Sequence, residues 1–287
     1  MTIVVVGATG NIGRHVVARL VAKGEEIRVL TRDATRAQLV WGDAAGSLDV
    51  VEGDLADAGV LERLVAGADR AFITTPGTPD QPALELGFLR AVRAEGVEHV
   101  VKISVLGPAS DHVVPYARWQ AEIERDIPTG LATTILRPNW FAENFLGSAP
   151  TIATGAIYGS AGAGRVAFVD SRDTAAVAVA ALTGGLPVGD YAVTGPAALT
   201  FDEAAAAIGR GLGRPVSYVD LTDEQFHGAL LSAGLPADVA DAVVAINQNA
   251  RRGALSQVTD VVRRATGEAP RSLEQWAADN RAALPAA

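Results

Sequence analysis

The chain contains no cysteine, so it can form neither a disulfide framework nor a thiolate nucleophile. Its four histidines lack the spacing of metal ligands, which argues against a structural metal site. Lysine is scarce as well, because only Lys23 and Lys102 occur among 24 basic residues. No apolar run approaches the roughly 18 consecutive residues that a membrane span needs. We therefore expect no metal and no membrane partner.

The formal net charge of −9 argues against nucleic acid as the main partner, because such binding depends on clustered cations that neutralise phosphates. A strand pattern begins at Ile3, with no basic segment or cleavage site before it. These features predict a cytoplasmic protein that acts on a small molecule. We expect a monomer or a homodimer.

Short β-branched runs alternate with amphipathic helical patterns through the first half, which predicts βαβ units and a parallel sheet covered on both faces. The expected strands are Ile3–Val6, Ile27–Thr31, Asp49–Glu52, Ala71–Thr74, His99–Ser104 and Thr133–Leu136. The expected helices between them are Ile12–Ala22, Ala34–Val40, Gly59–Val65, Pro82–Ala94 and Tyr116–Arg125. The fold class is therefore α/β, a doubly wound Rossmann sheet with its ligand crevice at the carboxyl ends of the strands.

The rhythm changes after Pro138, where the sequence becomes irregular and rich in glycine and alanine. We expect a Rossmann domain over residues 1–138 and a smaller, mostly helical substrate lobe over residues 139–287. The glycine cluster Gly155–Gly164 predicts a loop or hairpin. A late strand at Asp190–Thr194 is expected to rejoin the main sheet. Further helices are expected at Asp173–Leu182, Asp223–Ala233, Pro236–Asn247 and Ser272–Ala283, with another that begins after Thr200.

Three glycines join the first strand to the first helix and predict a dinucleotide-binding turn with GxxGxxG spacing. Gly7 permits the tight turn, Gly10 lets the backbone approach a pyrophosphate, and Gly13 lets the helix pack close to the sheet. The helix N-terminus then offers N–H groups to the phosphates. A tight strand-to-helix turn without a nucleotide would also use glycines.

The end of the second strand indicates which cofactor is bound. In NAD-specific Rossmann proteins an acidic residue at this place accepts hydrogen bonds from the ribose, whereas here Thr31 is followed by Arg32. A guanidinium fork suits a phosphate, so the sequence favours NADP(H) over NAD(H). Arg36 is a second candidate cation or an ordinary exposed helix residue, and Asp33 argues mildly for NAD(H).

Two further strand ends are expected to line the same crevice. Asp54 follows the third strand and either accepts from the adenine amino group or caps the next helix. Thr74, Thr75 and Pro76 end the fourth strand and should run beneath the cofactor ribose.

With these motifs the chain resembles the atypical short-chain dehydrogenase/reductase family, and within it the NmrA-like group with its type 2 quinone oxidoreductases and triphenylmethane-dye reductases. The resemblance covers nearly the whole chain. It rests on Val5-Val6-Gly7-Ala8-Thr9-Gly10-Asn11-Ile12-Gly13, Thr31-Arg32, Gly53-Asp54-Leu55, Val101-Lys102-Ile103-Ser104-Val105-Leu106-Gly107, Leu136-Arg137-Pro138-Asn139-Trp140-Phe141 with Asn144, and Tyr191-Ala192-Val193-Thr194-Gly195-Pro196.

The resemblance implies a set of cofactor contacts, with Asn139 to Phe141 near the nicotinamide. These contacts come from the glycine turn (Gly7, Thr9, Gly10, Asn11, Ile12, Gly13), from the second and third strand ends (Thr31, Arg32, Asp54, Leu55), and from Thr74, Thr75, Pro76, Ile103, Ser104, Pro138, Asn139 and Phe141.

The proton relay of the wider superfamily is incomplete. Its standard members use a serine and a Tyr-x-x-x-Lys pair, in which the lysine lowers the tyrosine pKa. Ser104 and Tyr116 occupy plausible places, but Gln120 stands where the lysine would be. Lys102, on the same strand face as Ser104, either substitutes electrostatically or pairs with a carboxylate or solvent. His112 is a candidate proton donor in a loop, or else a surface histidine.

An acceptor that tolerates such a site is a quinone, because hydride addition gives a phenolate whose conjugate acid has a pKa of roughly 10. The aromatic side chains Tyr116, Trp119, Trp140, Phe141 and Phe145 would then form a flat wall for a planar ring, unless they belong to the core. The leading hypothesis is an NADPH-dependent reductase of a quinone or similar conjugated acceptor. The rivals are an NmrA-like dinucleotide sensor without turnover and a reductase of another double bond in secondary metabolism.

Overall fold

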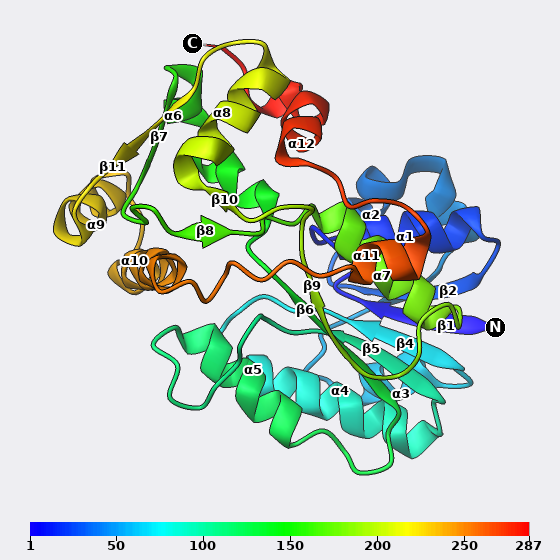
Figure 1. The fold of residues 1–287 in the computed structure, drawn as a ribbon. Helices are drawn as coiled ribbons and strands as arrows, with labels where there is room; N and C mark the ends of the chain where they lie inside the picture. Colours follow the sequence, from blue (N-terminus) through cyan, green and yellow to red (C-terminus); the bar gives the residue numbers. More distant parts are fainter. Residues whose placement is uncertain (287) are drawn as a thin grey trace.

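The computed structural model describes residues 1–286, apart from the side chains of residues 36–39 and 43–45. A central sheet of seven parallel strands organises the chain (Figure 1). Across the sheet the strands are β3 (Asp49–Glu52), β2 (Glu26–Thr31), β1 (Thr2–Val6), β4 (Arg70–Ile73), β5 (His99–Ile103), β6 (Thr133–Pro138) and β9 (Asp190–Val193). This is the strand order of a doubly wound Rossmann sheet, so the predicted fold class is confirmed.

Helices cover both faces of the sheet. One face carries α3 (Ala58–Val65), α4 (Gln81–Glu95) and α5 (Pro115–Arg125). The other carries α1 (Gly13–Ala22), α2 (Ala34–Trp41), α7 (Ser171–Leu182) and α11 (Val261–Thr266), while the turn η1 (Gly42–Ser47) follows α2. Among the described helices, none combines the length and hydrophobicity that crossing a membrane requires.

The first strand shows why the sheet is buried on both sides. Ile3 and Val5 belong to the hydrophobic core under α1 and α7, whereas Val4 and Val6 belong to the core under α3 and α4. Successive side chains of a strand point to opposite faces, so an unbroken apolar run fits a strand between two helical layers.

The remaining elements form a lobe next to the carboxyl ends of the strands (Figure 1). They are η2 (Ala142–Ser148), α6 (Ala149–Ala153), β7 (Ala156–Gly159), β8 (Arg165–Val166), β10 (Leu199–Thr200), α8 (Phe201–Leu212), β11 (Ser217–Asp220), α9 (Asp223–Ser232), α10 (Ala237–Arg251), α12 (Leu273–Asp279) and η3 (Arg281–Ala283). Residues 139–286 thus contribute both to the lobe and to the sheet region, because β9 belongs to the sheet and α7 and α11 pack on it.

The glycine cluster after the sixth strand is not a hairpin. Its first part forms β7, which pairs in parallel with β11, some 60 residues further along. A parallel partner must come from a distant segment, because two parallel strands cannot be joined by a tight turn. The helix expected after Thr200 is present, and the Thr200 hydroxyl accepts from the Glu203 N–H in a complete capping box.

The turn between β1 and α1 has no room for side chains at two of its glycines. Gly7 has φ +77°, and a Cβ there would lie 2.1 Å from the Thr74 carbonyl oxygen at the end of β4. A Cβ on Gly13 would lie 2.1 Å from the Gly7 carbonyl oxygen. The helix therefore starts against the strand that precedes it, in agreement with the packing predicted from the GxxGxxG spacing.

We expect Gly13→Ala to lower the free energy of unfolding by about 2 kcal/mol or more, because the clash involves backbone that cannot rotate away. Gly228→Ala is the matched control, since no atom lies within 4 Å of a Cβ built on this residue of α9. The control should be neutral or stabilise by about 0.5 kcal/mol. Urea unfolding measures both, and equal stability of the two variants would refute the packing argument.

Candidate functional site

The N-terminus of α1 points at the loop that the glycines form. Its N-cap residue, Ile12, provides no side-chain hydrogen bond, and its first turn carries no acidic residue. Gly10 donates its N–H to the Gly7 carbonyl at 2.9 Å, which closes the turn. Thr9 and Asn11 lie at the surface of this turn, whereas Ile12 is buried. An uncapped helix N-terminus of this kind can bind an anion.

The second strand ends in a local turn that leaves a guanidinium at the surface. The Thr31 hydroxyl accepts from the Asp33 N–H and donates to the Asp33 carbonyl, so Thr31 is committed to the backbone. Arg32 is exposed and has no ion-pair or hydrogen-bond partner among the described residues. The side chain of Arg36, the second candidate cation, lies outside the described residues.

The structure at the end of the third strand distinguishes between the two predicted roles of Asp54, a contact to the adenine and an N-cap of the next helix. Asp57, not Asp54, is the N-cap of α3, and its carboxylate accepts from the N–H groups of Gly59 and Val60. Asp54 accepts from the Ala56 N–H at 2.8 Å and is exposed, next to the buried Leu55. The helix-cap reading of Asp54 is therefore wrong.

A buried polar cluster lies behind the ends of β4 and β5. The Lys102 ammonium is 2.8 Å from Glu85 Oε2, and neither side chain has any exposed surface. The same ammonium donates to the Ile103 carbonyl at 3.0 Å and to the Gln120 side-chain oxygen. Thr75 donates to Glu85 Oε1 at 2.6 Å, so the cluster also holds the loop after β4.

Lys102 is therefore not available as a catalytic group. Its three ammonium hydrogens have three partners, and it faces the packed layer of α4 and α5. The strand periodicity correctly placed it on the face of Ser104, and its alternative role, a lysine paired with a carboxylate, is the one that the structure has. Gln120, which replaces the lysine of the superfamily pair, is one of the acceptors that satisfy it.

Ser104 is also committed to the protein. It is buried, and its hydroxyl donates to Glu124 Oε1 at 2.5 Å. Glu124 in turn pairs with Arg137 at 2.6 Å. In this structure the Ser104 hydroxyl is thus donated to Glu124 and not left free, and a catalytic role for Ser104 stays a prediction.

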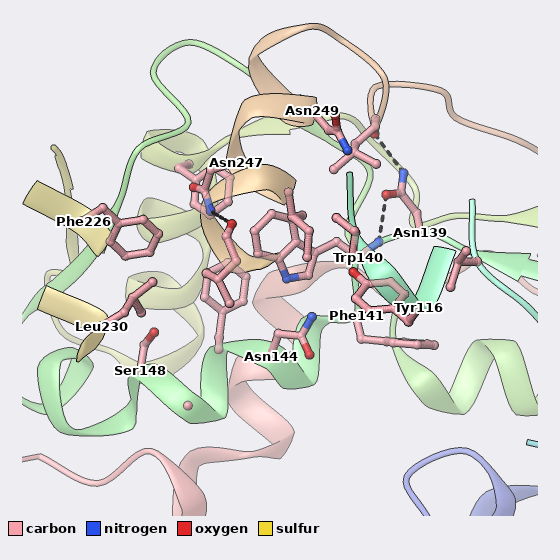
Figure 2. A pocket seen from close by; sticks show the side chains of 18 of the residues that line it. Tyr116, Asn139, Trp140, Phe141, Asn144, Ser148, Phe226, Leu230, Asn247 and Asn249 are labelled. Atoms are coloured by element: carbon pink, nitrogen blue, oxygen red, sulfur yellow. Dashed lines mark hydrogen bonds between the residues drawn. The ribbon is translucent and has the colours of Figure 1, made fainter. Parts of the chain in front are cut away.

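A large apolar cavity opens at the carboxyl ends of β5 and β6 (Figure 2). Its volume is about 670 Å³, within the range of sites for drug-sized ligands. Ser104 and Pro138 line its floor at the strand ends. None of the described residues that line it carries a carboxylate, an ammonium or a guanidinium.

Tyr116 is the candidate acid that does reach this cavity. Its phenol has no hydrogen-bond partner in the described part of the chain, and Gly77 lies against its Cβ. Burial raises the pKa of Tyr116 to about 12, so the phenol keeps its proton throughout the neutral range. It can act as a neutral hydrogen-bond donor.

His112 also lines the cavity, and its tautomer follows from its contacts. The Val114 N–H donates to His112 Nδ1 at 3.0 Å, so the neutral ring carries its proton on Nε2. The Asn249 side-chain amide lies 3.3 Å from that nitrogen. As placed, the Asn249 Nδ2 faces this nitrogen, so with that tautomer the two form a hydrogen bond only when the amide is flipped to present its oxygen.

The asparagines that line the cavity differ in whether their side chains already have hydrogen-bond partners in the protein. Asn139 is buried, donates to the Leu255 carbonyl and accepts from the Trp140 N–H, both at 2.8 Å. Asn247 is equally committed, to Ser160 and Val243. By contrast, the Asn144 amide has no hydrogen-bond partner among the described residues. Asn144 and Tyr116 are thus two of the uncommitted polar groups that a ligand's oxygens can meet.

The aromatic residues expected to form a wall divide into two sets. Trp140, Phe141 and Phe145 line the cavity, whereas Trp119 does not. Trp140 and Phe145 also pack in the lobe core, for example with ring centroids 5.4 Å apart between Trp140 and Phe201. The core interpretation and the wall interpretation therefore both hold for these two residues.

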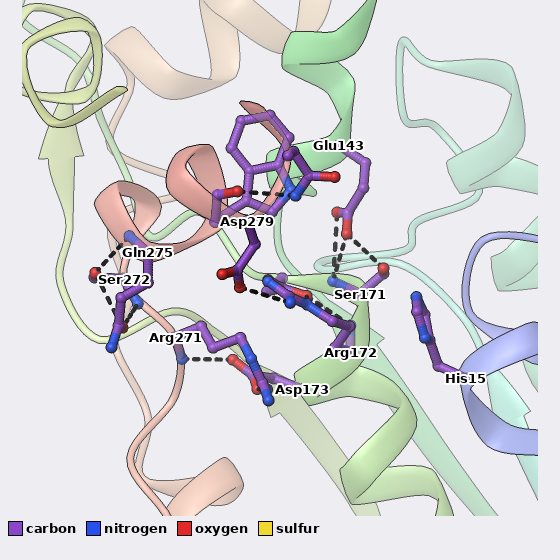
Figure 3. A network of polar contacts seen from close by, with 12 residues as sticks. His15, Glu143, Ser171, Arg172, Asp173, Arg271, Ser272, Gln275 and Asp279 are labelled. Carbon is purple, nitrogen blue, oxygen red and sulfur yellow. Dashed lines mark hydrogen bonds and ion pairs between the residues drawn. The ribbon is translucent and has the colours of Figure 1, made fainter. Parts of the chain in front are cut away.

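A polar network ties this wall to the glycine turn (Figure 3). Glu143, on η2 next to Asn144, accepts from the backbone N–H and the hydroxyl of Ser171 at the start of α7. The Ser171 hydroxyl lies 3.4 Å from the Asn11 side-chain oxygen. Burial raises the pKa of Glu143, and burial lowers that of the neighbouring His15 to about 4. The hydrogen bonds between Glu143 and Ser171 hold the η2 segment beside the glycine turn.

Several cavity residues had no signal in the sequence. Phe226 and Leu230 of α9 and Val243 and Ile246 of α10 also line it. Their helical periodicity showed that one face of each helix is apolar, but not what that face meets. Among the described residues, no group of three or more histidine or acidic side chains is arranged to hold a metal ion.

The strand order, together with the uncapped helix after the glycine turn, defines a protein of the doubly wound Rossmann class. The chain belongs to the NmrA-like family, whose model matches residues 1–277. The predicted family is therefore confirmed.

Two relatives and one solved structure are similar over nearly their full length. An NAD(P)H azoreductase of Xenophilus azovorans is 37% identical, over 99% of this chain and 100% of the relative. A (4-alkanoyl-5-oxo-2,5-dihydrofuran-3-yl)methyl phosphate reductase of Streptomyces griseus is 36% identical, over 98% and 99%. The structure of an NADPH-dependent quinone oxidoreductase from Escherichia coli, complexed with NADPH, has a TM-score of 0.87 at 26% identity, over 96% and 99%.

We expect Lys102→Met to destabilise the fold by about 3–5 kcal/mol, because it leaves the Glu85 carboxylate buried without a counter-charge. The double variant Lys102→Met with Glu85→Gln should recover at least half of that loss. Thr75 and Gln81 both donate to Glu85 Oε1, and an amide oxygen at this place can accept the same hydrogen bonds without a charge. Thermal and urea unfolding measure both variants. A double variant no more stable than the single one would contradict the structural role of the pair.

Proposed function

We propose that this protein is an NADPH-dependent reductase of quinones or of similar planar, conjugated acceptors. The observation that carries the proposal is the uncharged, aromatic-lined cavity of about 670 Å³ at the carboxyl ends of β5 and β6. The names of the azoreductase and the quinone oxidoreductase support the same reaction class. The cytoplasm as the place of action and a monomeric or homodimeric state remain predictions.

The residues that follow the carboxyl ends of β1, β2 and β3 suit NADPH. The uncapped α1 N-terminus and the glycine turn can hold the pyrophosphate, and the exposed Arg32 can pair with a 2′-phosphate. The carboxylate of Asp54 is exposed at the neighbouring strand end, where it can accept from the adenine. When bound, NADPH supplies the hydride that the reaction needs.

The protein's own contribution is positioning and hydrogen bonding. Trp140 and Phe141 offer flat surfaces to a ring, and the Asn144 amide and the Tyr116 phenol offer donors to its oxygens. Burial raises the pKa of Tyr116 and Gln120 stands in place of the lysine that would lower it, so Tyr116 is a neutral hydrogen-bond donor without the tuning of the superfamily pair. A quinone takes up one hydride and one proton to become a hydroquinone, and its reduced oxygen is no more basic than a phenolate.

A dinucleotide sensor is the second candidate, and the observation that favours it is the commitment of Lys102, Ser104 and Gln120 to structural contacts. Such a protein would bind NADPH without oxidising it. Both candidates would bind NADPH at the glycine turn and the neighbouring strand ends, so NADPH binding alone does not distinguish them.

Turnover separates the two candidates. Purified protein, NADPH and a panel of benzoquinones and naphthoquinones should oxidise NADPH with saturation kinetics, followed at the nicotinamide absorbance. The control omits the protein, because quinones react slowly with NADPH on their own. NADPH binding by calorimetry, with no oxidation above the control for any acceptor, would exclude the reductase and support the sensor.

The cofactor preference is tested at the second strand end. Arg32→Ala should weaken NADPH binding about 10- to 100-fold and NADH binding less than about 3-fold, because only NADPH has the phosphate that the guanidinium can pair with. Arg90→Ala, an exposed arginine on α4, is the control and should change neither Kd. Equal weakening of both cofactors by Arg32→Ala would overturn the assignment.

A further inference from the structure

The cavity has two chemically different ends. Figure 2 shows Tyr116 and Phe141 at one end and Phe226 and Leu230 at the other. The first end adjoins the strand ends and holds the uncommitted Tyr116 phenol. The second end is a wall of aliphatic and aromatic groups from α9 and α10, with the Ser148 hydroxyl beside it.

The cavity is larger than one aromatic ring requires. At about 670 Å³ it matches the volume of sites that enclose a whole drug-sized ligand. The nicotinamide, which Asn139 and Phe141 would contact, and the ring of the acceptor would fill the Tyr116 end, so the α9–α10 end remains for another part of the acceptor. Apolar surface of this kind is best covered by an apolar group of the ligand, because water there gains no hydrogen bonds.

The charge of the wall limits the ligand further. The described lining residues include no lysine, arginine or carboxylate, so His112 is the one lining side chain that could carry a positive charge and none offers a carboxylate to an ammonium. Transfer of an unpaired charge into such a site is strongly unfavourable. The Streptomyces relative is named for a substrate that is a phosphate ester, so this cavity suits a different acceptor.

We infer that the acceptor is an uncharged amphiphile, with a planar quinone-like head at Tyr116 and Asn144 and an alkyl or isoprenoid tail against Phe226, Leu230, Leu235, Val243 and Ile246 of the α9–α10 region. The inference rests on the proposed reductase function and names the substrate class of that site. The α9–α10 end is the tail subsite, and its apolar wall disfavours a charged group on the part of the acceptor that lies there.

The test compares three quinones on the intact protein with NADPH. These are 2,3-dimethoxy-5-methyl-1,4-benzoquinone, the same ring with a decyl chain, and 1,2-naphthoquinone-4-sulfonate. The decyl compound should have a KM at least about 10-fold lower than that of the tail-less ring, which corresponds to burial of only two methylene groups. The sulfonate should have a kcat/KM at least about 100-fold lower than that of the tail-less ring.

Leu230→Asp places a charge in the tail subsite and should bring the KM ratio of the tail-less to the decyl quinone close to one. Leu231→Asp is the matched control, because Leu231 is the next residue of the same helix, is 42% exposed and does not line the cavity. The control should keep the wild-type ratio. If Leu230→Asp does not fold, Leu230→Ala, which only shortens the side chain, should lower the ratio several-fold.

The outcomes separate the two proposals. Turnover of the tail-less ring with equal KM values for both uncharged quinones would overturn the tail subsite and leave the reductase in place. Failure to turn over any quinone would overturn the reductase. In that case, calorimetry with the two uncharged quinones still tests the subsite, and equal Kd values would overturn it too.

Discussion

The buried ion pair between Lys102 and Glu85 is the contact on which the packing of α4 and α5 behind the ends of β4 and β5 depends. Both charges lie entirely away from solvent, so each is stable only while the other is present. Through Thr75 and Gln120 the pair also connects the loop after β4 with α5, the helix that carries Tyr116. The position of the phenol in the cavity is thus linked to the packing of α4 and β5.

The same pair gives a physical reason for the glutamine at position 120. The Lys102 ammonium needs a third acceptor, and the Gln120 oxygen provides it. A lysine at 120 would bring a second cation into a cluster with only one carboxylate, where water cannot screen the repulsion. A glutamine at this position therefore suits the charge balance of this cluster, in which one ammonium faces one carboxylate.

The sheet could be predicted because its signal is local. Each strand of the first half is a short β-branched run, and the structure keeps the expected segments to within a few residues. The turn glycines could be assigned for the same reason, since Gly7 and Gly13 are separated by one tight turn. The late strand predicted at Asp190–Thr194 is also present, as β9, and it pairs with β6 in the main sheet.

The rest of the site depends on contacts between distant segments. Periodicity placed Lys102 and Ser104 on one strand face, but nothing local indicates that Glu85 and Glu124 are their partners. The β7–β11 pairing was missed because a four-residue strand in a glycine-rich stretch resembles a loop. An amphipathic pattern in α9 and α10 indicates an apolar face without indicating that it borders a cavity.

The placement of α9 and α10 bears on how the family can diversify. Neither helix contributes to the two hydrophobic cores that cover the sheet, and of their residues only Ala250 belongs to the lobe core. Most substitutions on their cavity side therefore leave the parts that hold the Rossmann sheet together untouched. In a protein that is only marginally stable, this separation allows ligand preference to change by single mutations at little cost to the stability of the sheet that carries the glycine turn.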